Sequence, residues 1–464
     1  MVPLYHITPV PSLLGRRGLP NDPEDSSMSS TAKPRRHFEQ EYRQKLCTPT
    51  EAASLVKSGD HLCFPLFAGE PTLLVKALNA RKHELEGVVV NQQHHLTPDY
   101  FTEASVPHIR VNAWFTSHVS RHAVQKGWAD FVPNNFSEVP RLLREYWPMN
   151  VAATVVSPMD DHGFFTCSLS VGYTMEAIKK AETVIIQVNP HAPRTHGDCH
   201  IHVSEVDRII ECDAPLVQQP PAGVTQVEEA IGAHIAALID DGSTIQLGFG
   251  GIPNAVAKAL HAKKDLGIHT ELLTESMVDL MMSGVVNGSR KSIHRGKTLG
   301  TFAIGTSRLY EFMNENPMIE MHPVDYVNDP SVIGRNDKMV SINATIEVDL
   351  LGQCCSESLG HLQWSGTGGQ SDFIRGANAS KGGKSFITTA ATAKHGTVSC
   401  IVPTLTPGAA VTTSKNDVDH VVTEFGVAKL RGQTARQRAL NLISVAHPDF
   451  RAELREAAKK MNRI

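Results

Sequence analysis

The sequence lacks the features that would assign it to several specialised classes of protein. No apolar run is long enough to span a membrane, because the longest apolar segments are interrupted by Asp, Gly or Pro. No basic block of the kind that binds nucleic acid is present, and 44 Lys and Arg against 48 Asp and Glu give a net charge of −4. The eight cysteines form no CxxC pair or zinc-type spacing, which indicates reduced thiols. We therefore expect a cytoplasmic protein with neither a membrane nor a nucleic-acid partner.

The first 46 residues also lack sustained apolar periodicity, and they are rich in proline and serine. This composition predicts a disordered leader over residues 1–46. Its arginines raise the alternative of a transit peptide, but Asp22, Glu24 and Asp25 are unusual in such segments. Met28 is an alternative start, so the sequence alone does not decide whether residues 1–27 belong to the native protein.

Beyond the leader, the chain of 464 residues is 41% hydrophobic and allows two or more domains. Two segments repeat one order of local signals. Each opens with a capping box, at Thr48–Glu51 and at Thr225–Glu228. A short helix, an apolar strand, a Gly-Pro turn, a second helix and a second strand follow in both copies. This order predicts right-handed βαβ units and parallel sheets. The fold class is therefore α/β, with two duplicated open parallel-sheet domains over residues 47–218 and 219–464.

In open parallel sheets, ligands bind beyond the carboxyl ends of the strands. The run Gly248-Phe-Gly-Gly-Ile-Pro253 follows the predicted strand 244–247 and opens a helix. Its glycines allow close backbone approach, and a helix N-terminus favours negative charge. It is not the dinucleotide fingerprint GxGxxG, because Pro253 replaces the last glycine. A structural glycine turn explains this loop equally well.

The next predicted strand, 267–271, ends in the carboxylate of Glu271, with a helix expected from Leu272. A carboxylate beside clustered amide donors can act as a nucleophile on a carbonyl. The alternative is a helix N-terminal residue stabilised by the macrodipole. A second candidate is Glu424, which ends the predicted strand 418–424. From the residues alone these alternatives stay open.

Four motifs, in this order and spacing, resemble the acetyl-CoA hydrolase/transferase family: GFGGIPNAV, GIHTE, GTGGQSDF and VVTEFGVAKLRG. Within that family the chain looks most like the 4-hydroxybutyrate, butyryl and itaconate CoA-transferases. In the first half, the segments 131–133, 160–164 and 188–194 are similar to the family's N-terminal domain. The resemblance extends from about residue 46 to the C-terminus. It implies domains of the CoA-transferase type and a homo-oligomer, a dimer or higher.

The resemblance also implies residue roles. Glu271 matches the glutamate nucleophile of the H-T/S-E motif, whereas Glu424 belongs to a different segment and is expected to be structural or near the substrate. The implied activity is CoA transfer between short-chain carboxylates, by a ping-pong mechanism through a glutamyl-CoA thioester. Acyl-CoA is then a substrate, with no permanently bound cofactor and no metal. The residues implied to contact CoA are Gly248, Phe249, Gly250, Gly251, Ile252, Ile346, Gly369 and Asn416.

Two alternative functions share these motifs: hydrolysis of the thioester by water, and binding of CoA without catalysis. The candidate carboxylates are acetate, succinate, 4-hydroxybutyrate and itaconate. Arg194 or Arg375 could pair with the second carboxylate of a diacid, and either could equally form a structural ion pair.

The chain contains 23 histidines, some at spacings that occur in metal sites. His196 and His200 are four residues apart, but Gly197-Asp-Cys199 between them is a poor helix. His200 and His202 would share one face of a strand, a spacing that is also common in ordinary polar surface. We assign no metal to either pair.

Overall fold

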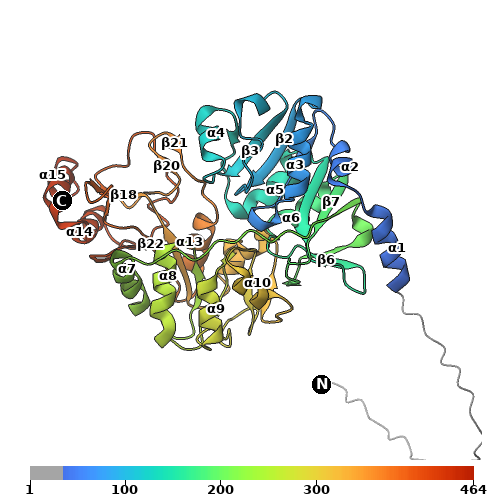
Figure 1. Cartoon of the computed structure of the whole chain (residues 1–464). Helices are drawn as coiled ribbons and strands as arrows, with labels where there is room; N and C mark the ends of the chain where they lie inside the picture. The colour runs from blue at the N-terminus through green and yellow to red at the C-terminus, as the bar shows by residue number, and fades with distance from the viewer. Residues whose placement is uncertain (1–34) are drawn as a thin grey trace, which may run out of the picture.

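The computed structural model describes residues 35–464, which form two α/β domains, each built around a parallel sheet (Figure 1). The first sheet has the order β10-β7-β5-β1-β2-β3-β4, and all its strands are parallel. Its strands are β1 (His61–Cys63), β2 (Val88–Gln93), β3 (Ile109–Phe115), β4 (Asp130–Phe131), β5 (Val151–Val156), β7 (Thr183–Val188) and β10 (Arg208–Glu211). The helices of this domain are α2 (Pro49–Ser54), α3 (Thr72–Ala80), α4 (Arg121–Lys126), α5 (Val139–Tyr146) and α6 (Thr174–Lys180).

The second sheet has the order β12-β11-β17-β22-β26-β27, and only β27 runs antiparallel to its neighbour. Its strands are β11 (Thr244–Leu247), β12 (Gly267–Ile268), β17 (Met339–Ala344), β22 (Lys384–Thr388), β26 (His420–Thr423) and β27 (Gly426–Lys429). The helices of this domain include α7 (Gln226–Ala237), α8 (Gly251–Ala259), α9 (Glu275–Met282), α13 (Gln370–Ala379), α14 (Ala435–Val445) and α15 (Arg451–Lys460).

The internal repeat is visible in both sheets. Capping boxes at Thr48 and Thr225 open α2 and α7, as predicted. In the first domain β1 lies between β2, the next strand of the repeat, and the later strand β5. In the second domain β11 lies in the same way between β12 and the later strand β17. The same connectivity occurs twice, which confirms the predicted fold class.

The prediction of a disordered leader is wrong for residues 35–45. Arg35–Lys45 forms helix α1, whose Phe38 and Tyr42 pack against the core of the first domain. Lys45 Nζ also donates to the carbonyl oxygen of Val203 at 2.7 Å. Two aromatic residues four apart give a polar helix one apolar stripe, a signal too short to stand out in that composition. Residues 1–34 of the leader lie outside the described residues.

The segment around Glu271 also differs from the prediction. The strand ends at Ile268, and His269 forms only an isolated bridge with Leu299. After Glu271 comes the short strand β13 (Leu272–Leu273), and α9 begins at Glu275 instead of Leu272. The chain leaves the large sheet here, and β13 pairs with β15 (Phe302–Ala303). The apolar spacing from Leu272 onwards therefore does not mark the start of a helix.

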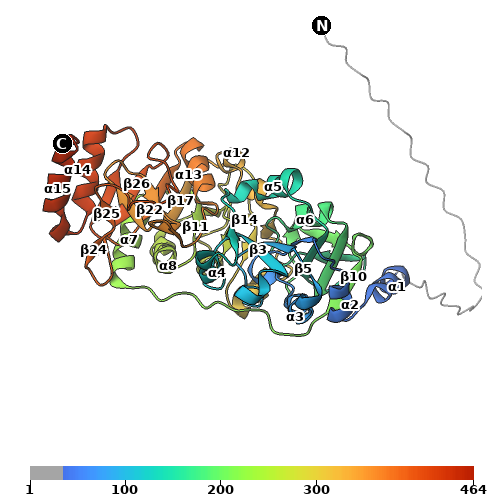
Figure 2. The same ribbon diagram turned by 90° about the horizontal axis from the view of Figure 1, so that it is seen from above.

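The two domains share one apolar core. A single cluster of buried side chains contains residues of both, from Cys63 to Val422. A small parallel sheet also crosses the interface, because β8 (His196–Gly197) pairs with β16 (Ile319–Met321), which pairs with β14 (Thr298–Gly300). From above the molecule is elongated, with α1 at one end and α15 at the other (Figure 2). Within the described residues, no helix combines the length and the apolar character needed to cross a membrane.

Tyr173 links the carboxyl ends of two central strands, and its loss should destabilise the first domain. Its buried hydroxyl donates to Phe64 O at 2.9 Å and accepts from Gln93 N at 3.0 Å. We expect Tyr173→Phe to cost about 1–3 kcal/mol, because two buried backbone groups lose their partner. Urea unfolding measures this cost. Tyr146→Phe is the control, since that side chain is 67% exposed and should shift stability by less than about 0.5 kcal/mol.

Candidate active site

A cavity of about 660 Å³ lies between the two domains, where the carboxyl ends of strands from both sheets meet. The first domain contributes residues that follow β2 and β3, and the second contributes residues that follow β11, β12 and β17. This is the position at which open parallel sheets bind ligands. The lining includes Phe67, His94, Phe115, Phe136, Gly248, Phe249, Glu271, Leu272, Phe302, Ile304, Ile346 and Trp364.

Glu271 presents its carboxylate to this cavity, and two donors hold it. Asn328 Nδ2 donates to Glu271 Oε2 at 2.8 Å. The backbone N–H of Gly369, at the N-terminus of α13, is the second donor. A Cβ on residue 369 would overlap both Glu271 Oε2 and Asn328 Nδ2, so only glycine allows α13 to approach this closely.

Burial raises the pKa of Glu271 to about 7, and the hydrogen bonds from Asn328 and Gly369 oppose this rise. Removal from water disfavours the charged form, whereas donors aimed at the oxygens favour it. The carboxylate is therefore poorly solvated but still ionised above about pH 7. A poorly solvated carboxylate is a better nucleophile than a surface one.

A second carboxyl, fully buried, lies beside the partly buried Glu271. Asp372, in the first turn of α13, accepts from the backbone N–H of Ser137 at 3.0 Å and from its hydroxyl at 2.9 Å. Burial raises the pKa of Asp372 to about 7, and the charge of Glu271 raises it further. Because Ser137 belongs to the first domain, this contact also joins the two domains at the start of α13.

Stacked rings form the first-domain wall of the cavity. His94 lies between Phe67 and Phe115, with ring centroids 4.4 and 4.1 Å away. Phe302 stacks on the other side of Phe67 at 5.8 Å, and Phe136 meets Phe302 edge-on at 6.2 Å. Burial lowers the pKa of His94 to about 3, so its ring is neutral. The wall therefore offers a flat apolar surface to a ligand.

Five of the residues predicted for the site lie together. Glu271, Gly248, Phe249 and Ile346 line the cavity, and Gly369 donates to Glu271. The other four predicted CoA contacts lie outside the lining. Gly250 caps α8, whose first residues are Gly251 and Ile252, and the N–H of Asn416 donates to Ser414 Oγ at 3.3 Å in a separate turn. Contact of any of these residues with CoA stays a prediction.

The competing carboxylate, Glu424, does not line the cavity. Its Oε2 accepts from the backbone N–H of Ala391 at 2.9 Å, which fits the structural reading. Arg375 pairs with Asp417 at 3.2 Å, away from the cavity.

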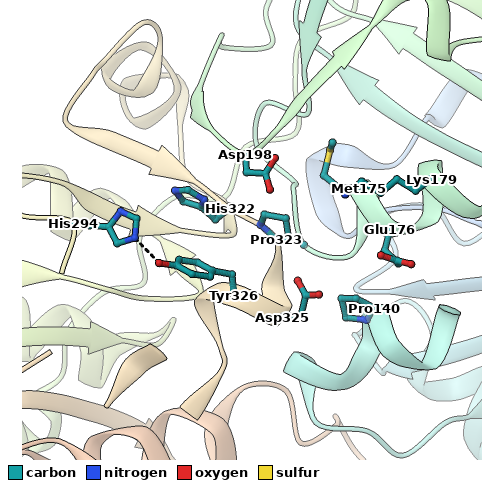
Figure 3. A pocket seen from close by; sticks show the side chains of 11 residues that line it. Pro140, Met175, Glu176, Lys179, Asp198, His294, His322, Pro323, Asp325 and Tyr326 are labelled. Atoms are coloured by element: carbon teal, nitrogen blue, oxygen red, sulfur yellow. Dashed lines mark hydrogen bonds between the residues drawn. The ribbon is translucent and has the colours of Figure 1, made fainter. Parts of the chain in front are cut away.

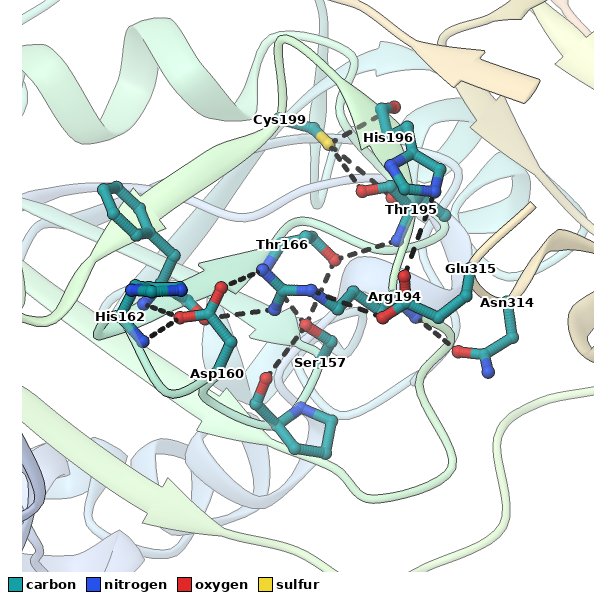
Figure 4. A network of polar contacts seen from close by, with 12 residues as sticks. Ser157, Asp160, His162, Thr166, Arg194, Thr195, His196, Cys199, Asn314 and Glu315 are labelled. Carbon is teal, nitrogen blue, oxygen red and sulfur yellow. Dashed lines mark hydrogen bonds and ion pairs between the residues drawn. The ribbon is translucent and has the colours of Figure 1, made fainter. Parts of the chain in front are cut away.

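Arg194 is part of a polar network between the domains (Figure 4). It forms ion pairs with Asp160 and, at 3.6 Å, with Glu315. His196 also faces Glu315, at 3.9 Å. Both arginines considered for a diacid are therefore committed to structural ion pairs.

Among the described residues, one group of three side chains could hold a metal ion: His294, Glu320 and His322. It adjoins a second cavity between the domains, of about 420 Å³ (Figure 3). Its donors already have protein partners. Glu320 Oε2 lies 3.0 Å from His294 Nδ1 and 3.3 Å from His322 Nε2, and His294 Nε2 lies 2.7 Å from the Tyr326 hydroxyl. These side chains therefore hydrogen-bond to one another, and we interpret the group as a structural polar cluster.

The sequence did not reveal several residues around Glu271. Asn328 stands in Asn-Asp-Pro, a signal for a turn and a helix start but not for a contact 57 residues away. Asp372 lies in the motif GTGGQSDF, whose pattern indicates a glycine loop and not a second carboxyl beside Glu271. The stacked rings come from three separate segments of the first domain: Phe67 opens a short 3-10 helix, His94 follows β2 and Phe115 ends β3, and no periodic pattern connects them.

The two buried carboxyls should titrate as a coupled pair. Carbon-13 NMR of carboxyl-labelled protein should show two groups titrating near pH 7, since burial raises both pKa values to about 7. In Glu271→Gln, one group remains, and its pKa falls because the neighbouring negative charge is lost. Glu424→Gln is the matched control and should leave both pKa values unchanged. A remaining group with an unshifted pKa would contradict the coupling.

Comparison with known proteins identifies the family of this chain. The acetyl-CoA hydrolase/transferase N-terminal domain matches residues 29–218, and the C-terminal domain of the same family matches residues 305–458. A succinyl-CoA:cyclohexane-1-carboxylate CoA transferase of Geobacter metallireducens is 75% identical over 94% of this chain and 100% of its own length. A 4-hydroxybutyrate coenzyme A transferase of Clostridium kluyveri is 47% identical over 91% of this chain and 99% of its own.

Among solved structures, RipA from Yersinia pestis superposes with a TM-score of 0.89 at 41% identity, covering 92% of this chain and all of RipA. The match therefore extends over both domains and the cavity between them. The chain belongs to the acetyl-CoA hydrolase/transferase family and is an enzyme that transfers CoA.

Proposed function

We propose that this enzyme moves CoA between carboxylates by a ping-pong mechanism in which Glu271 carries CoA as a glutamyl thioester. The observation that supports this most directly is the poorly solvated Glu271 carboxylate, held by Asn328 and Gly369 at the mouth of a cavity between two domains. The family resemblance of the GIHTE motif points to the same residue.

The reaction begins when an oxygen of Glu271 attacks the thioester carbonyl of acyl-CoA. The C–S bond breaks, and CoA thiolate leaves behind an acyl-glutamyl anhydride. The thiolate then attacks the glutamyl carbonyl, which releases the first carboxylate and forms glutamyl-CoA. An acceptor carboxylate reverses both steps and regenerates Glu271. No proton is gained or lost overall, and the thioester energy is kept in a covalent bond.

Water must be kept from the anhydride, because its hydrolysis would end the cycle with free CoA. The stacked wall of Phe67, His94 and Phe115 is mostly aromatic carbon and carries no charge, so it offers water few hydrogen bonds. This wall favours transfer over the alternative, thioester hydrolysis. Release of CoA without an acceptor distinguishes the two.

The same wall favours a ring-shaped apolar carboxylate as one substrate. An apolar six-membered ring can pack against the rings that line this wall, whereas acetate would leave most of the wall uncovered. The 75% identical relative is named for cyclohexane-1-carboxylate and succinyl-CoA. We therefore propose a cyclic carboxylate as acceptor and succinyl-CoA as donor.

Glu271→Gln should abolish transfer and keep CoA binding, because the amide fills the same space but cannot attack. The assay follows conversion of succinyl-CoA with cyclohexane-1-carboxylate and gives parallel lines in double-reciprocal plots for the unmodified enzyme. Below about pH 7 its kcat/KM should fall, since protonation of Glu271 removes the nucleophile. Full activity in Glu271→Gln would reject this nucleophile; the control Glu424→Gln, which lies outside the cavity, should keep transfer.

Phe115→Ala should reduce selectivity for cyclic acceptors. Truncation removes one ring of the stack, and we expect a loss of about 1–3 kcal/mol in discrimination, or roughly 10–200-fold in the ratio of kcat/KM for cyclohexane-1-carboxylate over acetate. Phe425→Ala is the control, because that ring is exposed and outside the cavity. An unchanged ratio in Phe115→Ala would contradict the proposed acceptor site.

A further inference from the structure

We propose that His269 is a positioning residue for this reaction: its buried imidazole fixes the carbonyl of Val327, and thereby the Asn328 amide that holds Glu271. The inference rests on the proposed role of Glu271. It gives a function to the histidine two residues before Glu271 in GIHTE.

Both ring nitrogens of His269 have partners, although the side chain is fully buried. Nε2 lies 2.7 Å from Val327 O, and Nδ1 lies 3.2 Å from the Asn336 amide Nδ2. A carbonyl oxygen only accepts and an amide nitrogen only donates, so the proton is on Nε2. Burial lowers the pKa of His269 to about 3, which keeps the ring neutral at every working pH.

The bond from His269 joins the two segments that meet at Glu271. His269 and Glu271 lie on one segment, and Val327 and Asn328 lie on the other. The segments are therefore connected twice, by His269 to Val327 and by Asn328 to Glu271 at 2.8 Å. The two bonds start from adjacent residues, Val327 and Asn328, and end on residues two apart, His269 and Glu271.

Asn328 needs such support because its own helix is short. It follows α11 (Val324–Val327), which has only four residues and little stability of its own. The Asn328 N–H bonds back to Val324 O at 2.9 Å, which fixes the turn but not its distance from Glu271. The His269 bond sets that distance.

A residue that only filled space would not need both nitrogens paired. His95 is a comparison within this chain, since it is equally buried and neither of its ring nitrogens has a partner. Among charged groups, Lys291 has the largest effect on the pKa of His269. Its Nζ donates to Ile268 O at 2.9 Å and to Lys297 O at 2.8 Å.

Two substitutions separate the two hydrogen bonds of His269. An asparagine amide occupies the position of Nδ1, and a glutamine amide reaches the position of Nε2. His269→Asn therefore keeps the partner of Asn336 and loses the bond to Val327, whereas His269→Gln keeps the bond to Val327. His108→Gln is the matched control that also loses a bond to a backbone carbonyl: His108 bonds Leu85 O through Nδ1 at 2.8 Å, a position that the glutamine amide does not occupy, and it lies at the opposite end of β3 from the cavity.

We expect kcat to fall up to about 100-fold in His269→Asn, with KM for acyl-CoA near that of the wild type. We also expect the acidic limb of kcat/KM to move to higher pH, because the Asn328 bond that lowers the pKa of Glu271 is weakened. His269→Gln should stay within a few-fold of the wild type, and His108→Gln should be unchanged. Thermal unfolding shows that each variant is folded at the assay temperature.

The pKa of the Glu271 carboxyl, followed by carbon-13 NMR, tests the same point without turnover. It should rise in His269→Asn and stay unchanged in His269→Gln. Equal losses of activity in both variants with an unshifted pKa would overturn the inference and leave His269 a purely structural residue. Wild-type protein that transfers no CoA would contradict the proposed function, and the NMR titration would then still decide the role of His269.

Discussion

The contact on which the site depends is the one between the Glu271 carboxylate and its two donors, the Asn328 amide and the Gly369 N–H. Burial alone would keep this carboxyl protonated at neutral pH. Two hydrogen bonds oppose that tendency and leave the group near its midpoint around pH 7. The result is a carboxylate that is ionised but poorly solvated, which suits attack on a thioester.

The rest of the architecture holds Glu271 and its two donors in place. The duplicated βαβ units bring strand ends of both sheets to one cavity, and the continuous core fixes the distance between the domains. Asp372 links the start of α13 to Ser137 in the first domain, so the helix that supplies the Gly369 donor is fixed from both sides. The proposed His269 bond does the same for Asn328. Each donor to Glu271 is thus supported by a buried polar contact behind it.

Much of this could be predicted from the sequence, because the signals are local. Capping boxes, Gly-Pro turns and apolar strands of four residues gave the α/β class and the repeat, and GIHTE pointed to Glu271. The predicted strand 267–271 extends beyond the observed strand, which ends at Ile268, and the predicted leader includes helix α1. A change of sheet and a two-residue aromatic stripe leave only weak local patterns. The site also contains Asn328, Asp372 and the Phe67–His94–Phe115 stack. Their place in it depends on contacts between segments that are far apart in the chain, which no spacing rule predicts.

The most direct test of the account is the mass of the intact protein after brief incubation with succinyl-CoA and no acceptor, followed by peptide mapping. The account predicts an added CoA, less one water, on the peptide that contains Glu271, and its disappearance when a carboxylate acceptor is added. An unmodified protein that steadily releases free CoA would contradict it and point to hydrolysis. A CoA adduct on the peptide that contains Glu424 would move the reaction to another carboxylate.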